Sequence, residues 1–205
     1  MMNILIDVGH PAHVHLFKNF AIIMKNKGHN IVFTARDKES IIELLKKYNF
    51  TFYVLGVHKK YLVNKLITLL TYNYKLLKFC KAFLPEIFLS HGSPYAAHVS
   101  AILDKPHISF EDTEHSIEQI LLYKPFTDQI LTSNVFKRDL GKKQIRYNSF
   151  HEIAYLHPDY FTPNLEIKKE LNLAVNEKFV IIRFVSWAAT HDLGYRGLDI
   201  KINMN

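Results

Sequence analysis

The chain has 205 residues, of which 48% are hydrophobic and 22% are charged, as in a globular protein rather than a disordered one. The single cysteine, Cys80, excludes an internal disulfide and favours a reducing compartment, so we expect a cytoplasmic protein. The first residues have neither a basic region nor a long apolar stretch, and no run of about 18 apolar residues follows. The sequence therefore predicts no signal peptide and no membrane span.

The net charge of +7 is concentrated in one segment. Residues 44–85 contain eight lysines and no Asp or Glu, whereas the rest of the chain is nearly balanced. Only five of the 26 basic residues are arginine, the residue that usually recognises bases or phosphates through paired hydrogen bonds. We therefore expect no nucleic-acid partner, and we interpret the lysines as a diffuse positive field toward an anionic surface.

Short β-rich runs alternate with longer amphipathic runs up to about residue 132. This alternation predicts an α/β fold with a doubly wound, mostly parallel sheet that is covered by helices on both faces. Gly28, Pro85 and Pro106 stand where a helix must end before the next strand begins. In chain order, the expected strands are 3–8, 30–35, 51–55, 86–90, 106–110 and 128–132, and the expected helices are 13–27, 38–48, 62–84, 94–103 and 116–123.

The helix expected at 62–84 carries apolar residues at three- and four-residue spacing, which predicts one buried face. Its residues are Leu62, Leu66, Leu69, Leu70, Leu77, Cys80 and Leu84. The opposite face allows two interpretations. It is either a solvated surface or a basic surface that rests on anionic lipid at the inner face of the membrane. The lysines expected at such a membrane surface are Lys59, Lys60, Lys65, Lys75 and Lys78.

The pattern changes after Gln144. Two prolines and the lack of a clear period predict a linker with a short helix at 165–173, and the run 178–187 is typical of a buried strand. The residues that follow are mostly polar. We therefore expect three parts in the chain, which are a Rossmann-like domain at 1–150, a linker and short helix at 151–177, and the first strand and stub of a truncated second domain at 178–205.

Three loops place polar, titratable residues directly after an expected strand and before an expected helix. In an open parallel sheet, ligands bind beyond the carboxyl ends of the strands, and the start of a helix offers free N–H groups to an anion. We therefore expect these loops to meet at one edge of the sheet. The candidate catalytic bases are His10 and Glu111. The candidate substrate-binding residues are Gly9, His13, His91, Gly92, Ser93, Asp112 and Glu114.

The first of these loops, DVGHPAHVH, allows three interpretations. Gly9 permits a tight turn that would hold a phosphate at the start of the helix. His13 and His15 have the spacing of two metal ligands on a strand, although residues two apart on a helix diverge. The histidines would otherwise only cap and solvate the turn. The sequence predicts no cofactor and no bound metal, and a metal-dependent hydrolase that uses His13 and His15 is the alternative.

Five stretches, taken together and in order, resemble the domain-of-unknown-function family 354. The most specific is the last, in which Arg183, Trp187, His191 and Asp192 have a fixed spacing. That family is similar to the two-domain GT-B glycosyltransferases and to the UDP-N-acetylglucosamine 2-epimerases. The resemblance implies two Rossmann-like domains that face each other across a cleft. The stretches are ILIDVGHPAHVHLFKNF, LSHGSPYAAHVS, PHISFEDTEHS, FHEIAYLHPDYFTP and VIIRFVSWAATHDLGYRG.

The resemblance also implies roles for individual residues. Glu111 matches a glutamate of the epimerases, and His91-Gly92-Ser93 matches their His-Gly-Asp with a serine in place of the acid. We therefore expect the N-terminal half of a sugar-nucleotide enzyme, a glycosyltransferase or an epimerase, that is inactive alone. The expected partner is a sugar nucleotide or a glycan acceptor, bound weakly. The alternative is a non-catalytic remnant that binds a ligand or a partner chain.

Overall fold

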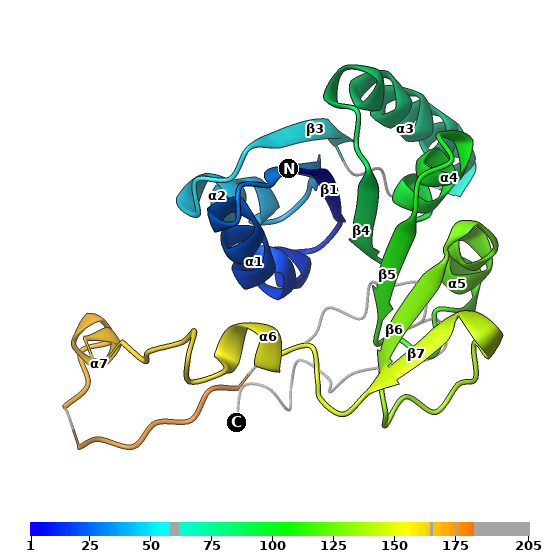
Figure 1. Cartoon of the computed structure of the whole chain (residues 1–205). Coiled ribbons are helices and arrows are strands. Elements are labelled where there is room, and N and C mark those ends of the chain that lie inside the picture. The colour runs from blue at the N-terminus through cyan, green and yellow to red at the C-terminus, as the bar shows by residue number, and fades with distance from the viewer. Residues whose placement is uncertain (58–61, 165, 175, 183–205) are drawn as a thin grey trace. The chain divides into compact units, whose positions relative to one another are not determined.

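A computed structural model describes residues 1–57, 62–164, 166–174 and 176–182. The chain divides into two compact units, Met1–Phe161 and Thr162–Asn205. The strands of the described part form one parallel sheet within the first unit, in the order β3-β2-β1-β4-β5-β6-β7 (Figure 1). The predicted Rossmann-like α/β class with a doubly wound parallel sheet is therefore confirmed.

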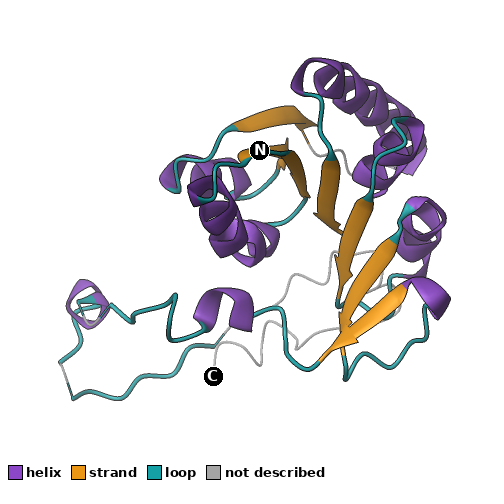
Figure 2. Cartoon of the chain, in the orientation of Figure 1, coloured by secondary structure: helices purple, strands orange, loops and turns teal. Residues whose placement is uncertain are grey.

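Strands and helices alternate along the first unit, as Figure 2 shows. All of the predicted strands up to residue 132 and all of the predicted helices up to residue 123 are present, with their ends shifted by a few residues. The strands are β1 (Asn3–Val8), β2 (Asn30–Asp37), β3 (Phe52–Val57), β4 (Ile87–His91), β5 (His107–Glu111), β6 (Gln129–Ser133) and β7 (Gln144–Tyr147). The longer helices are α1 (Pro11–Asn26), α2 (Ile41–Lys47), α3 (Leu62–Phe83), α4 (Pro94–Ile102) and α5 (Ile117–Tyr123).

The sequence does not predict β7. Its four residues, QIRY, are half-buried or exposed, so neither an apolar run nor an alternating pattern marks them. The strand forms because β6 offers a free edge, on which Ile130–Ser133 pairs with Gln144–Tyr147. Because β7 is parallel to β6, it ends at the carboxyl edge of the sheet. The residues after Tyr147 therefore lie at that edge.

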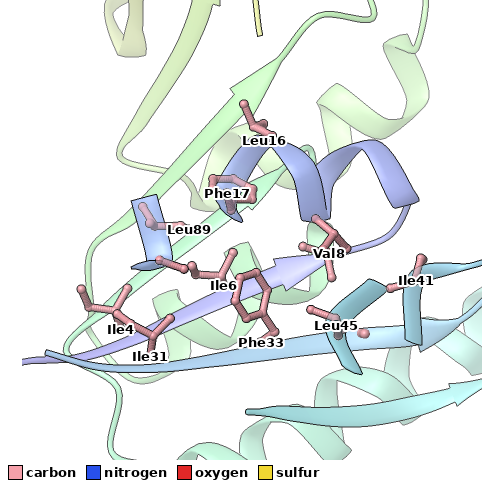
Figure 3. Close-up of a cluster of buried hydrophobic side chains, with 13 residues drawn as sticks. Ile4, Ile6, Val8, Leu16, Phe17, Ile31, Phe33, Ile41, Leu45 and Leu89 are labelled. Carbon is pink, nitrogen blue, oxygen red and sulfur yellow. The ribbon is translucent and has the colours of Figure 1, made fainter. Parts of the chain in front are cut away.

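The apolar core lies on both faces of the sheet. In β1, Ile4, Ile6 and Val8 pack with Phe17 of α1 and Phe33 of β2, as Figure 3 shows. The intervening Leu5 belongs to a second cluster that lies against α3 and α4. Successive side chains of a strand point to opposite faces, so a strand that is covered on both sides reads as a continuous apolar run.

Helix α3 buries only part of the predicted face, at Cys80. Tyr72, Leu76 and Cys80 are buried at four-residue spacing, whereas Leu70 and Leu84 are 63% and 66% exposed. The Tyr72 hydroxyl donates a hydrogen bond to the backbone oxygen of Val57 at 2.5 Å, so an aromatic residue with a polar end takes a core position. The spacing of the leucines alone does not reveal this.

The predicted membrane-surface lysines have different positions. Lys59 and Lys60 lie outside the described residues, as does the side chain of Lys65. The ammonium of Lys75 donates to the backbone oxygen of Leu55 at 2.8 Å, and Lys75 is half-buried. Lys78 is exposed. Lys75 therefore stabilises the contact of α3 with β3, and Lys78 is available to a partner surface.

Residues 151–161, predicted to lie in a linker, belong to the first unit. Helix α6 (Ile153–Leu156) lies against α1, where the amide of Asn19 donates to the backbone oxygen of Ala154 at 2.7 Å. In the second unit, α7 (Ile167–Glu170) falls within the short helix predicted there. Residues 178–182 have no regular secondary structure, and the rest of the predicted strand 178–187 lies outside the described residues. The division at 1–150, 151–177 and 178–205 stays a prediction.

His107 is a buried polar residue of β5 with 0% exposure. Its Nε2 lies 2.9 Å from the hydroxyl of Ser90, and its Nδ1 lies 2.9 Å from the hydroxyl of Thr127. Burial lowers the pKa of His107 from 6.5 to about 3. The folded protein therefore keeps this ring neutral in mildly acidic solution.

This neutral histidine should make the protein less stable in acid. Between pH 6.5 and about 3 the unfolded chain binds a proton at His107 that the folded chain does not bind. The free energy of unfolding should therefore fall as the pH falls, by at most about 1.4 kcal/mol per pH unit from this residue. Urea unfolding from pH 7 to pH 4 measures the effect. His107→Asn should show a shallower dependence than the wild type, and equal slopes would contradict the prediction.

Candidate functional site at the carboxyl edge of the sheet

The strand order reverses between β1 and β4, and ligands of such sheets bind in the crevice beyond the carboxyl ends of these two strands. The loop after β1 begins at Gly9, and β4 ends at His91. The loop after β5 begins at Asp112. The parallel sheet thus brings the three predicted loops to one edge, as expected from the sequence.

Asp112 lies between two imidazole rings at this edge. Its Oδ1 is 3.2 Å from His91 Nε2, and its Oδ2 is 3.3 Å from His151 Nδ1. The ring of His13, in the first turn of α1, stacks on that of His91 with centroids 4.4 Å apart. We call these four residues the histidine–aspartate cluster. They come from the ends of four different strands and the segments that follow them.

The carboxylate of Asp112 orients the two neighbouring rings. Burial raises the pKa of this carboxyl group, but hydrogen bonds from His151 and His91 more than offset that effect and lower the pKa. Asp112 is therefore a carboxylate that accepts hydrogen bonds from both rings. A neutral imidazole has one N–H, so each ring keeps its lone pair on its other nitrogen. The hydrogen-bond network thus assigns His91 Nδ1 and His151 Nε2 as proton acceptors.

His151 and Tyr147 combine unpaired polar atoms with a pocket at this edge. Within the described part of the chain, His151 Nε2 and the hydroxyl of Tyr147 are buried without a hydrogen-bond partner. Both residues line a cavity of about 330 Å³ whose other walls include Leu16, Phe110 and Phe150. An unpaired buried polar atom costs about 1–3 kcal/mol. Each atom therefore gains a favourable partner if a polar group of a bound molecule reaches it.

His13 presents a hydrogen-bond donor to this edge. Its Nδ1 accepts from the backbone N–H of Gly9 at 3.3 Å. Burial, together with the neighbouring His91 and Arg36, lowers the pKa of His13 well below 6.5. The neutral ring therefore carries its proton on Nε2. A Cβ at Gly9 would collide with the Arg36 guanidinium, so this glycine permits a close approach of the side chain.

His10 is the N-cap of α1 and is half-exposed. Its Nδ1 accepts from the backbone N–H of Ala12 at 3.2 Å, and its Nε2 lies 3.6 Å from the carboxylate of Glu39. The capping interpretation of the histidine-rich turn is therefore correct for His10. The ring centroid of His10 is 5.8 Å from that of His13, so His10 borders the cluster.

His13 and His15 do not converge. His13 stacks on His91, whereas His15 Nδ1 lies 3.2 Å from the hydroxyl of Tyr48. The His15 ring also packs against Tyr155. Residues two apart on a helix point in different directions, and the pair therefore does not form the two-ligand metal site of the hydrolase alternative.

The carboxylate of Glu111 is buried and accepts hydrogen bonds from the protein itself. Its side chain is 2% exposed, and its Oε1 accepts from the backbone N–H groups of Asp112 and Thr113 at 3.1 and 2.9 Å. Its Oε2 accepts from the hydroxyl of Tyr123 at 2.7 Å. Both oxygens are thus engaged, and Glu111 fixes the loop that carries Asp112.

The other predicted binding residues stabilise the loops at the same edge of the sheet. Gly92 has a φ of +57°, and a Cβ there would lie 2.7 Å from the amide of Gln119. Ser93 is buried and caps α4 through a 3.3 Å hydrogen bond from Ala96 N–H. Glu114 accepts from the backbone N–H of Lys137 at 2.7 Å, which ties its loop to the segment after β6. Direct substrate binding by these three residues stays a prediction.

The sequence predicts neither His151 nor Tyr147 as a site residue. Both reach the edge through β7, which the sequence does not reveal, and His151 stands in the segment predicted as a linker. The sequence does contain one indication that His151 is a site residue. It lies in FHEIAYLHPDYFTP, one of the stretches that carry the family resemblance.

Solved structures share this fold at low sequence identity. The UDP-GlcNAc 2-epimerase from Neisseria meningitidis, bound to UDP-GlcNAc, has a TM-score of 0.60 at 15% identity over 76% of this chain and 48% of its own. MurG from Acinetobacter baumannii has a TM-score of 0.57 at 9% identity, over 70% and 45%. The spinosyn rhamnosyltransferase SpnG, complexed with thymidine diphosphate, has a TM-score of 0.51 at 12% identity, over 64% and 45%. The chain thus spans about half the length of each.

The first unit therefore has the Rossmann-like fold found in GT-B glycosyltransferases and UDP-GlcNAc 2-epimerases. No curated protein matches the sequence. A family model, described as "Protein of unknown function (DUF354)", matches residues 2–192. Since this match covers most of the chain, the chain belongs to the DUF354 family.

Proposed function

We propose that this chain forms the sugar-binding and proton-transferring half of a GT-B-like enzyme that acts on a sugar nucleotide. The observation that supports the proposal best is the histidine–aspartate cluster at the point where the strand order reverses. Ligands bind at this point in open α/β sheets. A fold neighbour was solved with UDP-GlcNAc bound and another with thymidine diphosphate.

His151 is the base that we propose for this chemistry. Transfer of a sugar to a hydroxyl group requires a base that removes the hydroxyl proton, and epimerisation requires one that removes a proton from carbon. His151 lines the pocket, and its Nε2 is buried without a partner among the described residues. Asp112 on the other side of the ring would stabilise the imidazolium that forms. His13 Nε2–H would donate to an oxygen that gains negative charge.

The two bases predicted from the sequence fit less well. Both oxygens of Glu111 are engaged, so we propose that it positions the loop of Asp112. The Nδ1 of His10 is engaged as a helix cap, so its other nitrogen carries the proton in the neutral ring. His10 is therefore better suited to donate a hydrogen bond to a substrate oxygen than to accept a proton.

A titration of the chain with UDP-GlcNAc, UDP and free sugar tests this proposal. We expect weak binding, on the order of millimolar, because the chain supplies about half of a neighbour's length and hence few of the contacts. The ¹⁵N resonances of the histidine rings should shift at His91 and His151. Asp112→Asn should weaken binding and abolish these shifts.

His29→Gln is the matched control. This histidine lies directly before β2, at the amino edge of the sheet, where its Nδ1 accepts from the backbone N–H of Met2 at 3.2 Å, so its replacement should leave the affinity nearly unchanged. An absence of shifts at His91 and His151 with every compound, at concentrations that saturate a longer relative, would contradict the proposed site. Binding that Asp112→Asn leaves intact would do the same.

We also propose that the protein is cytoplasmic and touches the inner face of the membrane through α3. Ile67, Leu70 and Tyr74 are each more than 60% exposed on this helix, and Lys78 is exposed near them. No helix in the described part of the chain is both long and apolar enough to cross a bilayer. Exposed apolar side chains flanked by lysines are typical of peripheral binding to anionic lipid.

Sedimentation with liposomes measures this contact. We expect binding to vesicles with anionic lipid, weakened by salt, and little binding to neutral vesicles. A surface lysine contributes about 1 kcal/mol, so Lys78→Glu should lower the affinity at least about fivefold. Lys142→Glu, at an exposed position away from α3, should have a smaller effect. Equal binding to neutral and anionic vesicles would contradict the contact.

A further inference from the structure

The histidine–aspartate cluster has a geometry that suits a metal ion. His91, Asp112 and His151 each offer a ligand atom, and these atoms all lie within 4.8 Å of one another. The distances from the Asp112 oxygens to the two ring nitrogens are 3.2 and 3.3 Å. Bonds of 2.0–2.1 Å in a tetrahedral zinc site place neighbouring ligand atoms about 3.3 Å apart. The two distances involve different carboxylate oxygens, so a cation between the three side chains requires Asp112 to turn and its hydrogen bonds to the rings to be replaced by bonds to the metal.

The ligand types favour a transition metal. Two imidazoles and one carboxylate suit Zn²⁺, whereas Mg²⁺ and Ca²⁺ prefer oxygen ligands. The two histidine side chains are only 9% exposed, and the Asp112 side chain is 52% exposed. A cation would thus be enclosed by the two rings and open to solvent beside the carboxylate. Three protein ligands with one open position are typical of a zinc site that binds a further molecule.

The surrounding residues hold the three ligands in place. The hydroxyl of Thr113 donates to Asp112 Oδ1 at 2.8 Å, and His13 stacks on His91. The His151 ring packs edge-on against Phe110 and His91. Contacts of this kind orient metal ligands and raise their affinity. The ligands also stand at the ends of separate strands of one sheet, so the backbone already places them together.

We infer that His91, Asp112 and His151 bind one Zn²⁺ ion. This inference rests on the geometry of the three side chains and does not require the proposed enzymatic function. One consequence does rest on that function. If zinc occupies His151 Nδ1, the ring proton resides on Nε2, so the ring can no longer accept a proton from a substrate. Zinc should then inhibit the enzyme rather than activate it.

The experiment uses the 205-residue chain after removal of any affinity tag and of bound metal by a chelator. Calorimetry and thermal unfolding are recorded with Zn²⁺, Mn²⁺ and Mg²⁺. We expect one equivalent of Zn²⁺ to bind and to raise the melting temperature, and Mg²⁺ to do neither. Co²⁺ should give the visible absorption of a four-coordinate site. Asp112→Asn and His151→Gln should each lower the zinc affinity by more than about 100-fold, because each removes a direct ligand.

His29→Gln again serves as the control, because it removes a histidine at the amino edge of the sheet, away from the triad. It should leave zinc binding unchanged. Circular dichroism of the metal-free variants shows whether each variant folds. If one of the two ligand variants does not fold, the other still tests the site. Zinc binding that survives both ligand replacements, or no zinc binding to the wild type, would overturn the inference. Neither result affects the nucleotide titration, which is carried out with chelator present.

Discussion

The 205-residue chain by itself is expected to release no sugar from UDP-sugars above the uncatalysed rate. The chain covers between 45% and 48% of the neighbours compared above, so it supplies about half of such a fold. In a two-domain cleft, both walls fix the donor against the acceptor and exclude water. That positioning contributes roughly 7–11 kcal/mol to lowering the barrier. A panel of UDP-sugars, with and without hydroxyl acceptors, measures the release.

A longer member of the DUF354 family is the positive control. In that protein, replacing the residue that matches His151 by glutamine should lower kcat by about 10²–10⁴, with a smaller effect on KM, because a base acts mainly in the transition state. Replacing the residue that matches His29 should have little effect. Turnover by the 205-residue chain near the rate of the longer protein would show that one half suffices. An unchanged kcat in the first variant would remove His151 from the role of base.

Arg36→Met should destabilise the first unit by about 3–5 kcal/mol. Asp7 of β1 is fully buried, and its carboxylate accepts from the Arg36 guanidinium at 2.5 Å and from the Thr34 hydroxyl at 2.7 Å. The guanidinium also lies over the ring of Tyr95, 5.0 Å from its centroid. Removal of the arginine leaves a buried charge without its partner, which is the costly way to break such a pair. Urea unfolding of both proteins measures the difference.

The double variant Asp7→Leu with Arg36→Met separates the charge effect from a packing effect. It removes both charges, so it should recover much of the stability that Arg36→Met loses. Recovery will be incomplete because the Thr34 hydroxyl loses its acceptor. If the double variant is as unstable as the single one, the loss comes from packing around Tyr95 and not from the unpaired carboxylate.

The sequence alone determined the order of the elements in the first unit up to β6. Apolar runs such as Ile4-Leu5-Ile6 and the positions of Gly28, Pro85 and Pro106 are local signals, and the structure confirms the elements that they predict. The parallel arrangement also follows from the strand–helix alternation, because a parallel strand requires a crossover. The common edge of the three polar loops is a consequence of that topology. It placed His13, His91 and Asp112 together without any knowledge of side-chain positions.

Only the tertiary structure decided which residues complete the site. Strand β7 forms through pairing with an edge of β6, a contact between residues far apart in the pattern, and it is this pairing that brings Tyr147 and His151 to the cluster. The burial of Glu111 likewise depends on Tyr123, twelve residues away along the chain, whose hydroxyl reaches its carboxylate. Whether a carboxylate faces solvent or the core depends on such partners. Local sequence therefore identified the chemistry that is present at the edge, and the fold determined which of those groups remain available to a ligand.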